Sequence, residues 1–211
     1  MASTNAAKPK RAKISKYYDQ WADLPSASSC PGSLVMVGQY NNTEWQSDGV
    51  YWRPRGGRQR IYAPTLAFTT TGTTSEVAAW TPTIPAGMLF PGCQIETGAT
   101  ITKSGTAGTT TPRTRYNGAA GTIIGQNLTA TGTNVGSVIT SRLVSGGASG
   151  GNITLTNANA SNAGQGSGFT TTAATSVTHT MASAVTLNMT LQCSSAADTL
   201  TMQSAFMEIC G

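Results

Sequence analysis

The sequence predicts an all-β protein, a jelly-roll-like β-sandwich preceded by a small β-hairpin connector and an extended N-terminal arm. Only 10% of its 211 residues are Asp, Glu, Lys or Arg, against about 25% in an ordinary soluble protein. Threonine, which packs well on a pleated sheet, and glycine, which disfavours helix, fill much of the chain. Gly, Pro or Asn interrupts the Thr-rich runs about every ten residues, a spacing typical of sandwiches.

The positive charge is concentrated at the start of the chain. Residues 1–60 hold nine of the 13 basic and four of the eight acidic side chains, whereas residues 61–211 balance at zero. Residues 1–16 carry five positive charges and almost no apolar surface, so they cannot fold alone. We therefore expect residues 1–20 to form an arm that docks on another protein through charges and adjoining rings, namely Lys8, Lys10, Arg11, Lys13, Lys16, Tyr17, Tyr18 and Trp21.

Two other interpretations of the arm stay open. Its basic residues could neutralise the phosphates of a nucleic acid, or the arm could be a solvated tail without a partner. We favour docking on protein because the three aromatic residues provide the apolar contact area that dominates protein interfaces. Nucleic acid is thus not an expected partner.

Residues 21–63 are predicted to be a connector that contains a β-hairpin. Two apolar runs, LVMVGQ and VYWRPRGGRQRIYA, flank a polar stretch with turn-forming Asn-Asn and Asp-Gly pairs. Arginines alternate with aromatic rings in the second run, which would also suit a nucleic acid strand or an acidic sugar. Because proline and paired glycines bend the chain there, we expect contacts between subunits instead, through Tyr51, Trp52, Arg53, Arg55 and Arg58.

Residues 64–211 are predicted to form the β-sandwich tip. In AVTLNMTLQC the apolar side chains alternate with polar ones, as a half-buried strand requires. We expect this strand to form an antiparallel hairpin with the last strand of the chain. The predicted strands lie near residues 65–71, 76–83, 94–103, 121–129, 135–144, 151–157, 171–180, 184–193 and 199–210. The glycine-rich runs at 145–151 and 164–168 are predicted loops and the best candidates for a host-facing surface.

Catalytic, metal and membrane functions are not expected. His179 is the single histidine, no Gly-x-Ser-x-Gly elbow is present, and the four acidic residues of the tip are far apart in sequence, so we expect isolated carboxylates and no enzyme. The four cysteines lack the spacing of a metal or redox site, so we expect buried, reduced thiols and no cofactor. No apolar run approaches the roughly 18 residues of a membrane span.

Several segments together resemble a module of bacteriophage tail-fibre and related virion proteins. They are ADLPSAS at 22–28, YWRPRGGR at 51–58, TPTIPAGMLFPGCQIET at 81–97 and SSAADTLTMQSAFMEI at 194–209. The resemblance implies a trimeric or otherwise oligomeric sandwich tip carried by an N-terminal segment that attaches to the virion.

From this resemblance we expect a tail-fibre or tail-spike component on the particle surface, assembled in the host cytoplasm. Its partners would be other virion proteins, copies of itself, and a glycan or protein of the host surface. The alternative is a capsid decoration or head-fibre protein, and a depolymerase is the third and least favoured class.

Overall fold

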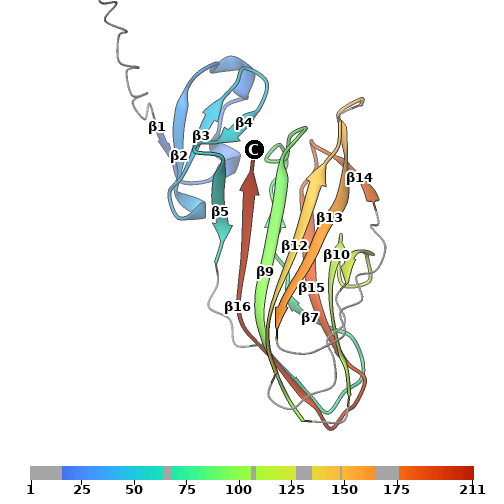
Figure 1. Ribbon diagram of the computed structural model, residues 1–211. Coiled ribbons are helices and arrows are strands. Elements are labelled where there is room, and N and C mark those ends of the chain that lie inside the picture. The colour runs from blue at the N-terminus through green and yellow to red at the C-terminus, as the bar shows by residue number, and fades with distance from the viewer. Residues whose placement is uncertain (1–15, 64–67, 106–107, 127–134, 148, 165–175) are drawn as a thin grey trace, which may run out of the picture.

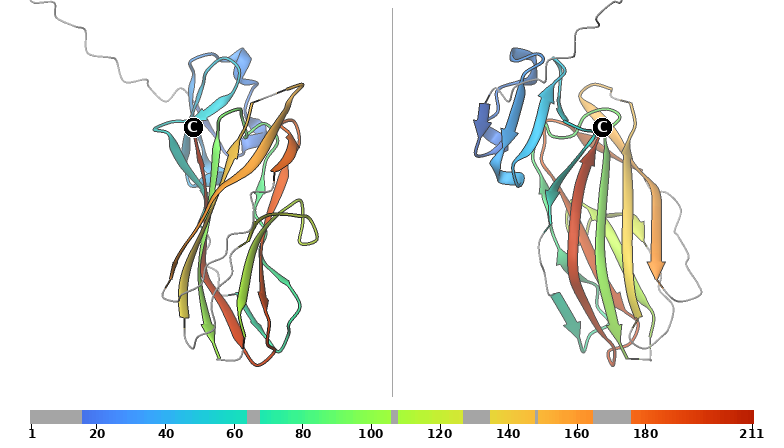
Figure 2. Two further views of the ribbon diagram at one scale, coloured as in Figure 1. Left: turned by 45° about the vertical axis from the view of Figure 1, so that its right-hand side comes forward. Right: turned by 60° about the vertical axis from the view of Figure 1, so that its left-hand side comes forward.

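The computed structural model describes residues 16–63, 68–105, 108–126, 135–147, 149–164 and 176–211. Within these residues the strands form one small sheet and two larger ones, and the larger two face each other as a sandwich (Figures 1 and 2). The predicted all-β sandwich is confirmed. No helix in this part of the chain is long and apolar enough to cross a membrane.

The N-terminal sheet has the strand order β1-β2-β3-β4, in which β1 runs parallel to β2 and the other pairs are antiparallel. It is larger than the predicted hairpin because the polar stretch between the apolar runs contains β3, whose Trp45 is fully buried. Asn41 and Asn42 form the turn before β3 with φ of 56° and 60°, a conformation that asparagine tolerates. The strands are β1 (Lys16–Tyr18), β2 (Leu34–Val37), β3 (Thr43–Ser47) and β4 (Trp52–Pro54). Three 3-10 turns connect them, η1 (Trp21–Asp23), η2 (Ala27–Ser29) and η3 (Gly38–Tyr40).

The first layer of the sandwich is a five-stranded antiparallel sheet of order β11-β10-β15-β7, with β8 also paired to β15. Its strands are β7 (Val77–Trp80), β8 (Thr83–Ile84), β10 (Thr110–Tyr116), β11 (Thr122–Gln126) and β15 (Val185–Cys193).

The second layer is a seven-stranded antiparallel sheet of order β14-β13-β12-β9-β16-β5, with β6 paired to the other end of β16. Its strands are β5 (Arg58–Tyr62), β6 (Phe68–Thr71), β9 (Gln94–Ser104), β12 (Val135–Ser145), β13 (Asn152–Gly164), β14 (Ser176–Thr180) and β16 (Thr199–Cys210). Because β5 comes from the predicted connector, that segment contributes a strand to the sandwich.

One continuous hydrophobic core joins the N-terminal sheet to the sandwich. On β15 the predicted apolar face is buried from Val185 to Cys193. Two polar residues of the opposite face, Asn188 and Thr190, are buried as well. Sequence alternation therefore identified the core face of this strand correctly but underestimated the cover on its other face.

The predicted hairpin between the last two strands is wrong. β15 lies in the five-stranded sheet and β16 in the seven-stranded one, and they pair with different neighbours. The SSAAD segment thus leads the chain from one layer to the other, and the apolar faces of the two strands meet across the core. Alternating apolar residues indicate which face of a strand is buried, but they do not distinguish a hairpin from two strands in opposite layers.

Two further expectations need correction. The strand β10 was not predicted, because its sequence TTPRTRY contains a proline and two arginines. The cysteines were all expected to be buried, yet only Cys93 and Cys193 are, whereas Cys30 and Cys210 are partly exposed. All four are free thiols.

Candidate functional site

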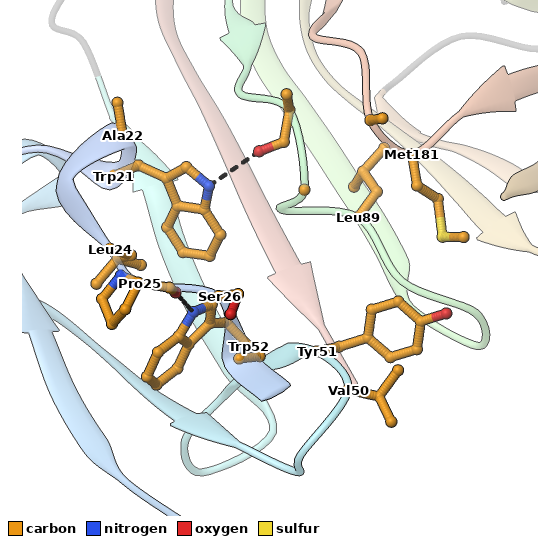
Figure 3. A pocket seen from close by; sticks show the side chains of 14 residues that line it. Trp21, Ala22, Leu24, Pro25, Ser26, Val50, Tyr51, Trp52, Leu89 and Met181 are labelled. Carbon is orange, nitrogen blue, oxygen red and sulfur yellow. Dashed lines mark hydrogen bonds between the residues drawn. The ribbon is translucent and has the colours of Figure 1, made fainter. Parts of the chain in front are cut away.

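Three of the predicted docking and connector residues, Trp21, Tyr51 and Trp52, lie where the N-terminal sheet meets the sandwich. A groove with a volume of about 380 Å³ opens at this junction. Figure 3 shows two tryptophans on one side of the groove and Leu89 and Met181 of the sandwich on the other. The lining residues are Trp21, Ala22, Leu24, Pro25, Ser26, Ala27, Val50, Tyr51, Trp52, Ala86, Gly87, Leu89, Met181 and Ala182.

Trp21 is the central contact of the junction. Its indole Nε1 donates a hydrogen bond of 3.1 Å to the carbonyl of Ala86 in the sandwich, and its ring meets Trp45 edge-on at 4.9 Å. The backbone N–H of Trp21 donates to the side-chain oxygen of Gln39. Only 6% of this residue is exposed, so the contacts of Trp21 visible in the structure hold the two parts of the same chain together.

Trp52 lies on the same side of the groove as Trp21 (Figure 3). It is buried, and its Nε1 donates a hydrogen bond of 3.0 Å to the carbonyl of Pro25 (Figure 3). The bond fixes the ADLPS segment against β4. Since both indole N–H groups are used within the chain, the polar atoms of these rings stabilise the walls of the groove.

The exposed part of the groove is apolar. Val50 is 64% exposed, and Tyr51 lies beside it with its ring tilted against Phe90 at 6.4 Å. Figure 3 shows Val50, Tyr51 and Met181 around one opening of the groove. Arg53 covers the same Phe90 ring from 4.6 Å. This surface suits an apolar side chain or the carbon face of a sugar ring.

The described end of the predicted arm is strand β1. Tyr17 is 52% exposed, and its hydroxyl lies against Gly38, where a Cβ atom would collide with it. The ammonium of Lys16 lies 4.8 Å from the centre of the Tyr18 ring. The other predicted arm residues, Lys8, Lys10, Arg11 and Lys13, are outside the described residues.

The connector arginines form ion pairs within the chain. Arg53 contacts Asp48, and Arg55 contacts Glu44 at 3.1 Å. Both ion pairs lie within the N-terminal sheet and its turns. Burial alone would raise the pKa of Asp48, but hydrogen bonds from the Tyr51 backbone, Arg53 and the Val50 backbone hold it below the ordinary value. Contacts of these residues with neighbouring subunits stay a prediction.

Arg58, at the start of β5, forms ion pairs with carboxylates on the neighbouring strands of the seven-stranded sheet. Its guanidinium lies 3.0 Å from Glu96 on β9 and 2.9 Å from Glu208 on β16, while Arg60 lies 2.8 Å from Glu208. The expectation of isolated carboxylates is therefore wrong for Glu96 and Glu208, which are direct cross-strand partners. Their separation in sequence concealed this, because β9 and β16 become neighbours only in the folded sheet.

Three polar clusters of the sandwich were not predicted as units. Glu76 pairs with Arg113 and Arg115 across the five-stranded sheet. The buried His179 lies 3.0 Å from the Tyr116 hydroxyl through Nδ1, and burial lowers the pKa of the imidazole. Lys103 and Asp198 form a buried ion pair. Each cluster joins residues far apart in sequence, so no local motif marks it. In the described part of the chain, no three His, Cys, Asp or Glu side chains group as metal ligands would.

No protein-family model matches the chain, and no curated protein matches it. Among solved structures, the chain is similar to the CBM2 module of Lactobacillus casei BL23 phage J-1 evolved Dit. The two are 10% identical with a TM-score of 0.32, over 72% of this chain and 96% of that module. At this level of similarity the match bears on neither detailed fold nor function.

Proposed function

We propose that this chain is a structural protein of a bacteriophage virion, a tail-fibre or tail-spike component that attaches by its N-terminal segment and acts in adsorption to the host surface. The observation that carries the proposal is the placement of the chain ends. The N-terminal sheet and the C-terminus lie at one end of an elongated molecule, and the sandwich projects away from them (Figures 1 and 2). An adsorption protein needs this separation between its attached end and its free end.

The connection between the two parts supports the same role because it is stiff. Strand β5 pairs with β16, Arg58 and Arg60 hold Glu208, and Trp21 bonds to Ala86. At the chain end, the Gly211 N–H donates a 3.0 Å hydrogen bond to the Gly57 carbonyl. A sandwich held in this way keeps one orientation relative to the N-terminal sheet, which favours presentation of its far end to a host surface.

The surface chemistry of the sandwich suits binding through hydrogen bonds and contact with copies of itself. Its described charged residues are used in ion pairs: Arg113 and Arg115 with Glu76, Lys103 with Asp198, and Arg142 with Glu96. Threonine hydroxyls pair along exposed strand positions, as between Thr69 and Thr201. A surface of hydroxyls with little net charge fits a homo-oligomer, which we propose is a trimer, and a glycan or protein of the host.

We further propose that the chain has no catalytic activity of its own. The two neighbouring carboxylates, Glu96 and Glu208, accept contacts from the same Arg58, so the oxygen atoms that would act on a sugar are occupied by a guanidinium. Glu96→Gln and Glu208→Gln should leave any glycan degradation by the particle unchanged. Loss of that degradation in either variant would make the chain a depolymerase.

Antibody labelling of the phage particles tests whether they carry the chain and where it is located. Gold-labelled antibody against the sandwich should mark the tail in electron micrographs. Labelling of the head would instead show a capsid decoration or head-fibre protein. Particles that contain no copy of the chain would overturn the virion assignment altogether.

Deletion of residues 1–15 tests the attachment. The shortened protein should fold, with an unchanged circular dichroism spectrum, but should be missing from particles assembled in its presence. A matched control replaces Lys8, Lys10, Arg11 and Lys13 by serine at full length, which separates the effect of charge from that of length. Normal incorporation of the shortened protein, together with salt-dependent DNA binding by the full chain, would contradict the proposed arm function.

A further inference from the structure

A buried lysine and a buried aspartate meet at the free end of the sandwich. Lys103 is at the end of β9, and Asp198 immediately precedes β16, whose Leu200 is the cross-strand partner of Lys103. Both strands have their other ends at the N-terminal sheet (Figure 1). The pair therefore lies at the end of the molecule remote from the attachment segment.

The two side chains are in contact and shielded from water. The Lys103 Nζ lies 3.1 Å from the Asp198 Oδ2, with 2% and 0% of the side chains exposed. Nζ also donates a hydrogen bond of 2.8 Å to the carbonyl of Gly105. A buried ion pair is costly to desolvate and seldom increases stability compared with apolar residues, so stability alone is a weak reason for its presence.

The turn after β9 leaves room for the Asp198 carboxyl group beside the lysine. Gly105 has a φ of 100°, and a Cβ atom at this position would collide with the Asp198 Oδ1. Only glycine therefore allows the carboxyl group to lie so close to the turn after β9. The buried Cys193 lies within the influence of both charges. Burial raises the pKa of its thiol, the Asp198 charge raises it further and the Lys103 charge opposes this.

We propose that Lys103 and Asp198 become joined by an intramolecular isopeptide bond between Nζ and the side-chain carbonyl carbon. The ammonium first transfers a proton to the carboxylate, which leaves a neutral amine and a carboxylic acid in contact. The amine attacks the carbonyl carbon, the C–N bond forms, and the hydroxyl departs as water with one of the two amine protons. No oxidant, reductant or cofactor is required.

The surroundings favour both the reaction and its product. The amine is in direct contact with the carboxyl group it would attack, since Nζ lies 3.1 Å from Oδ2, and fixed proximity of this kind favours an intramolecular reaction. The product amide retains one N–H, for which the Gly105 carbonyl is already the acceptor. The bond also replaces two buried charges by a neutral group, and it fastens the segment that joins the two layers to β9.

The intact mass of the unfolded full-length protein tests this inference. The wild-type chain should weigh one water molecule less than its sequence, and trypsin should not cleave after Lys103. The peptide that contains Lys103 should instead remain joined to the one that contains Asp198. Lys103→Arg and Asp198→Ala should each show the full mass of their own sequence, whereas the control Lys16→Arg should keep the loss.

Peptide mapping excludes the main artefact. A succinimide at Asp48-Gly49 also removes one water, but it leaves the Lys103 and Asp198 peptides separate. A wild-type protein of full mass, or a loss located only at Asp48, overturns the inference. If the Lys103 and Asp198 variants fail to fold, the mass of the wild-type protein and its peptide map still decide the question.

Discussion

At the residue scale, Glu76 accounts for two largely buried arginines, Arg113 and Arg115, on the five-stranded sheet. It accepts two 2.6 Å hydrogen bonds from Arg115 and one of 2.8 Å from Arg113. Thr190 on β15, the strand between β10 and β7, donates a further hydrogen bond to the Glu76 carboxylate. The hydrogen bond from Arg115 is the largest influence on the pKa of Glu76 and, with Thr190 and Arg113, lowers it despite burial. The cluster covers Thr190, which accounts for the burial of the polar face of β15.

Glu76→Gln should reduce the free energy of unfolding by about 2 kcal/mol at neutral pH, because two arginines lose a charged acceptor. The pKa of Glu76 is lower in the folded chain than its ordinary value of 4.5, so the ionised carboxylate stabilises the fold at pH values above 4.5. This stabilisation is lost as the pH falls below that value. Urea unfolding of both proteins at neutral and acidic pH measures the difference, which should shrink on acidification.

The control for Glu76 is Glu44→Gln, which removes a more exposed ion pair with Arg55. It should cost less than about 1 kcal/mol. Equal losses in the two variants would show that the three-residue cluster has no special contribution.

His179 should make stability depend on pH in a separate range. Burial lowers the pKa of its imidazole from the ordinary 6.5, so the unfolded chain takes up a proton more readily than the folded one. Stability should therefore be complete above that value and decline as the pH falls through it. Because this is the only histidine of the chain, His179→Asn should flatten the decline between about pH 7.5 and pH 5.5 in urea titrations. An unchanged slope would assign it to another group.

At the element scale, the sequence was informative where a strand carries its own alternating pattern. The apolar face of β15 could be predicted because period-two burial is a local property, and the bounds of β9 and β12 because Gly, Pro or Asn interrupts the chain near their ends. Pairing partners could not, since β15 and β16 are consecutive yet lie in different layers. β10 was missed because its arginines suggest an exposed loop until Glu76, the residue before β7, neutralises them.

The turn after β9 provides a test at this scale. Gly105→Ala places a methyl group against Asp198 and imposes a positive φ of 100° on alanine. Gly72→Ala is the matched control, since its φ is 75° but nothing lies near the added atom. The control should cost about 1 kcal/mol for the backbone strain alone, and Gly105→Ala should cost at least about 2 kcal/mol. Thermal and urea unfolding of both variants gives the comparison, and equal costs would mean that the carboxyl group moves aside freely.

At the scale of the whole molecule, the candidate site was only partly predictable. Trp21, Tyr51 and Trp52, which the sequence marked as contact residues, line the groove, while their partners outside the chain stay a prediction. The contacts of the predicted residues inside the chain, such as Trp21 with Ala86 and Arg58 with Glu208, form only when segments distant in sequence meet in the fold. An exposed partner and an internal one require the same residue types, so sequence alone did not separate them.

The oligomeric state is the prediction that belongs to the complete protein. The full chain should form a homo-oligomer, which we expect to be a trimer, so light scattering should give about three times 21.7 kDa. The reason is that the described charges of the sandwich are used in internal ion pairs, which leaves little repulsion between copies. Association through such a surface should not weaken as salt is added, because ionic screening acts on exposed charges.

The same measurement on residues 16–211 distinguishes association through the sandwich from association through the arm. If the sandwich surfaces meet, the shortened protein keeps its mass, and if the arm is responsible, it becomes a monomer. A full-length protein that stays monomeric at micromolar concentration would contradict the prediction. In the proposed adsorption role, the chain would then have to present single copies of its free end, each held in place by the junction around Trp21.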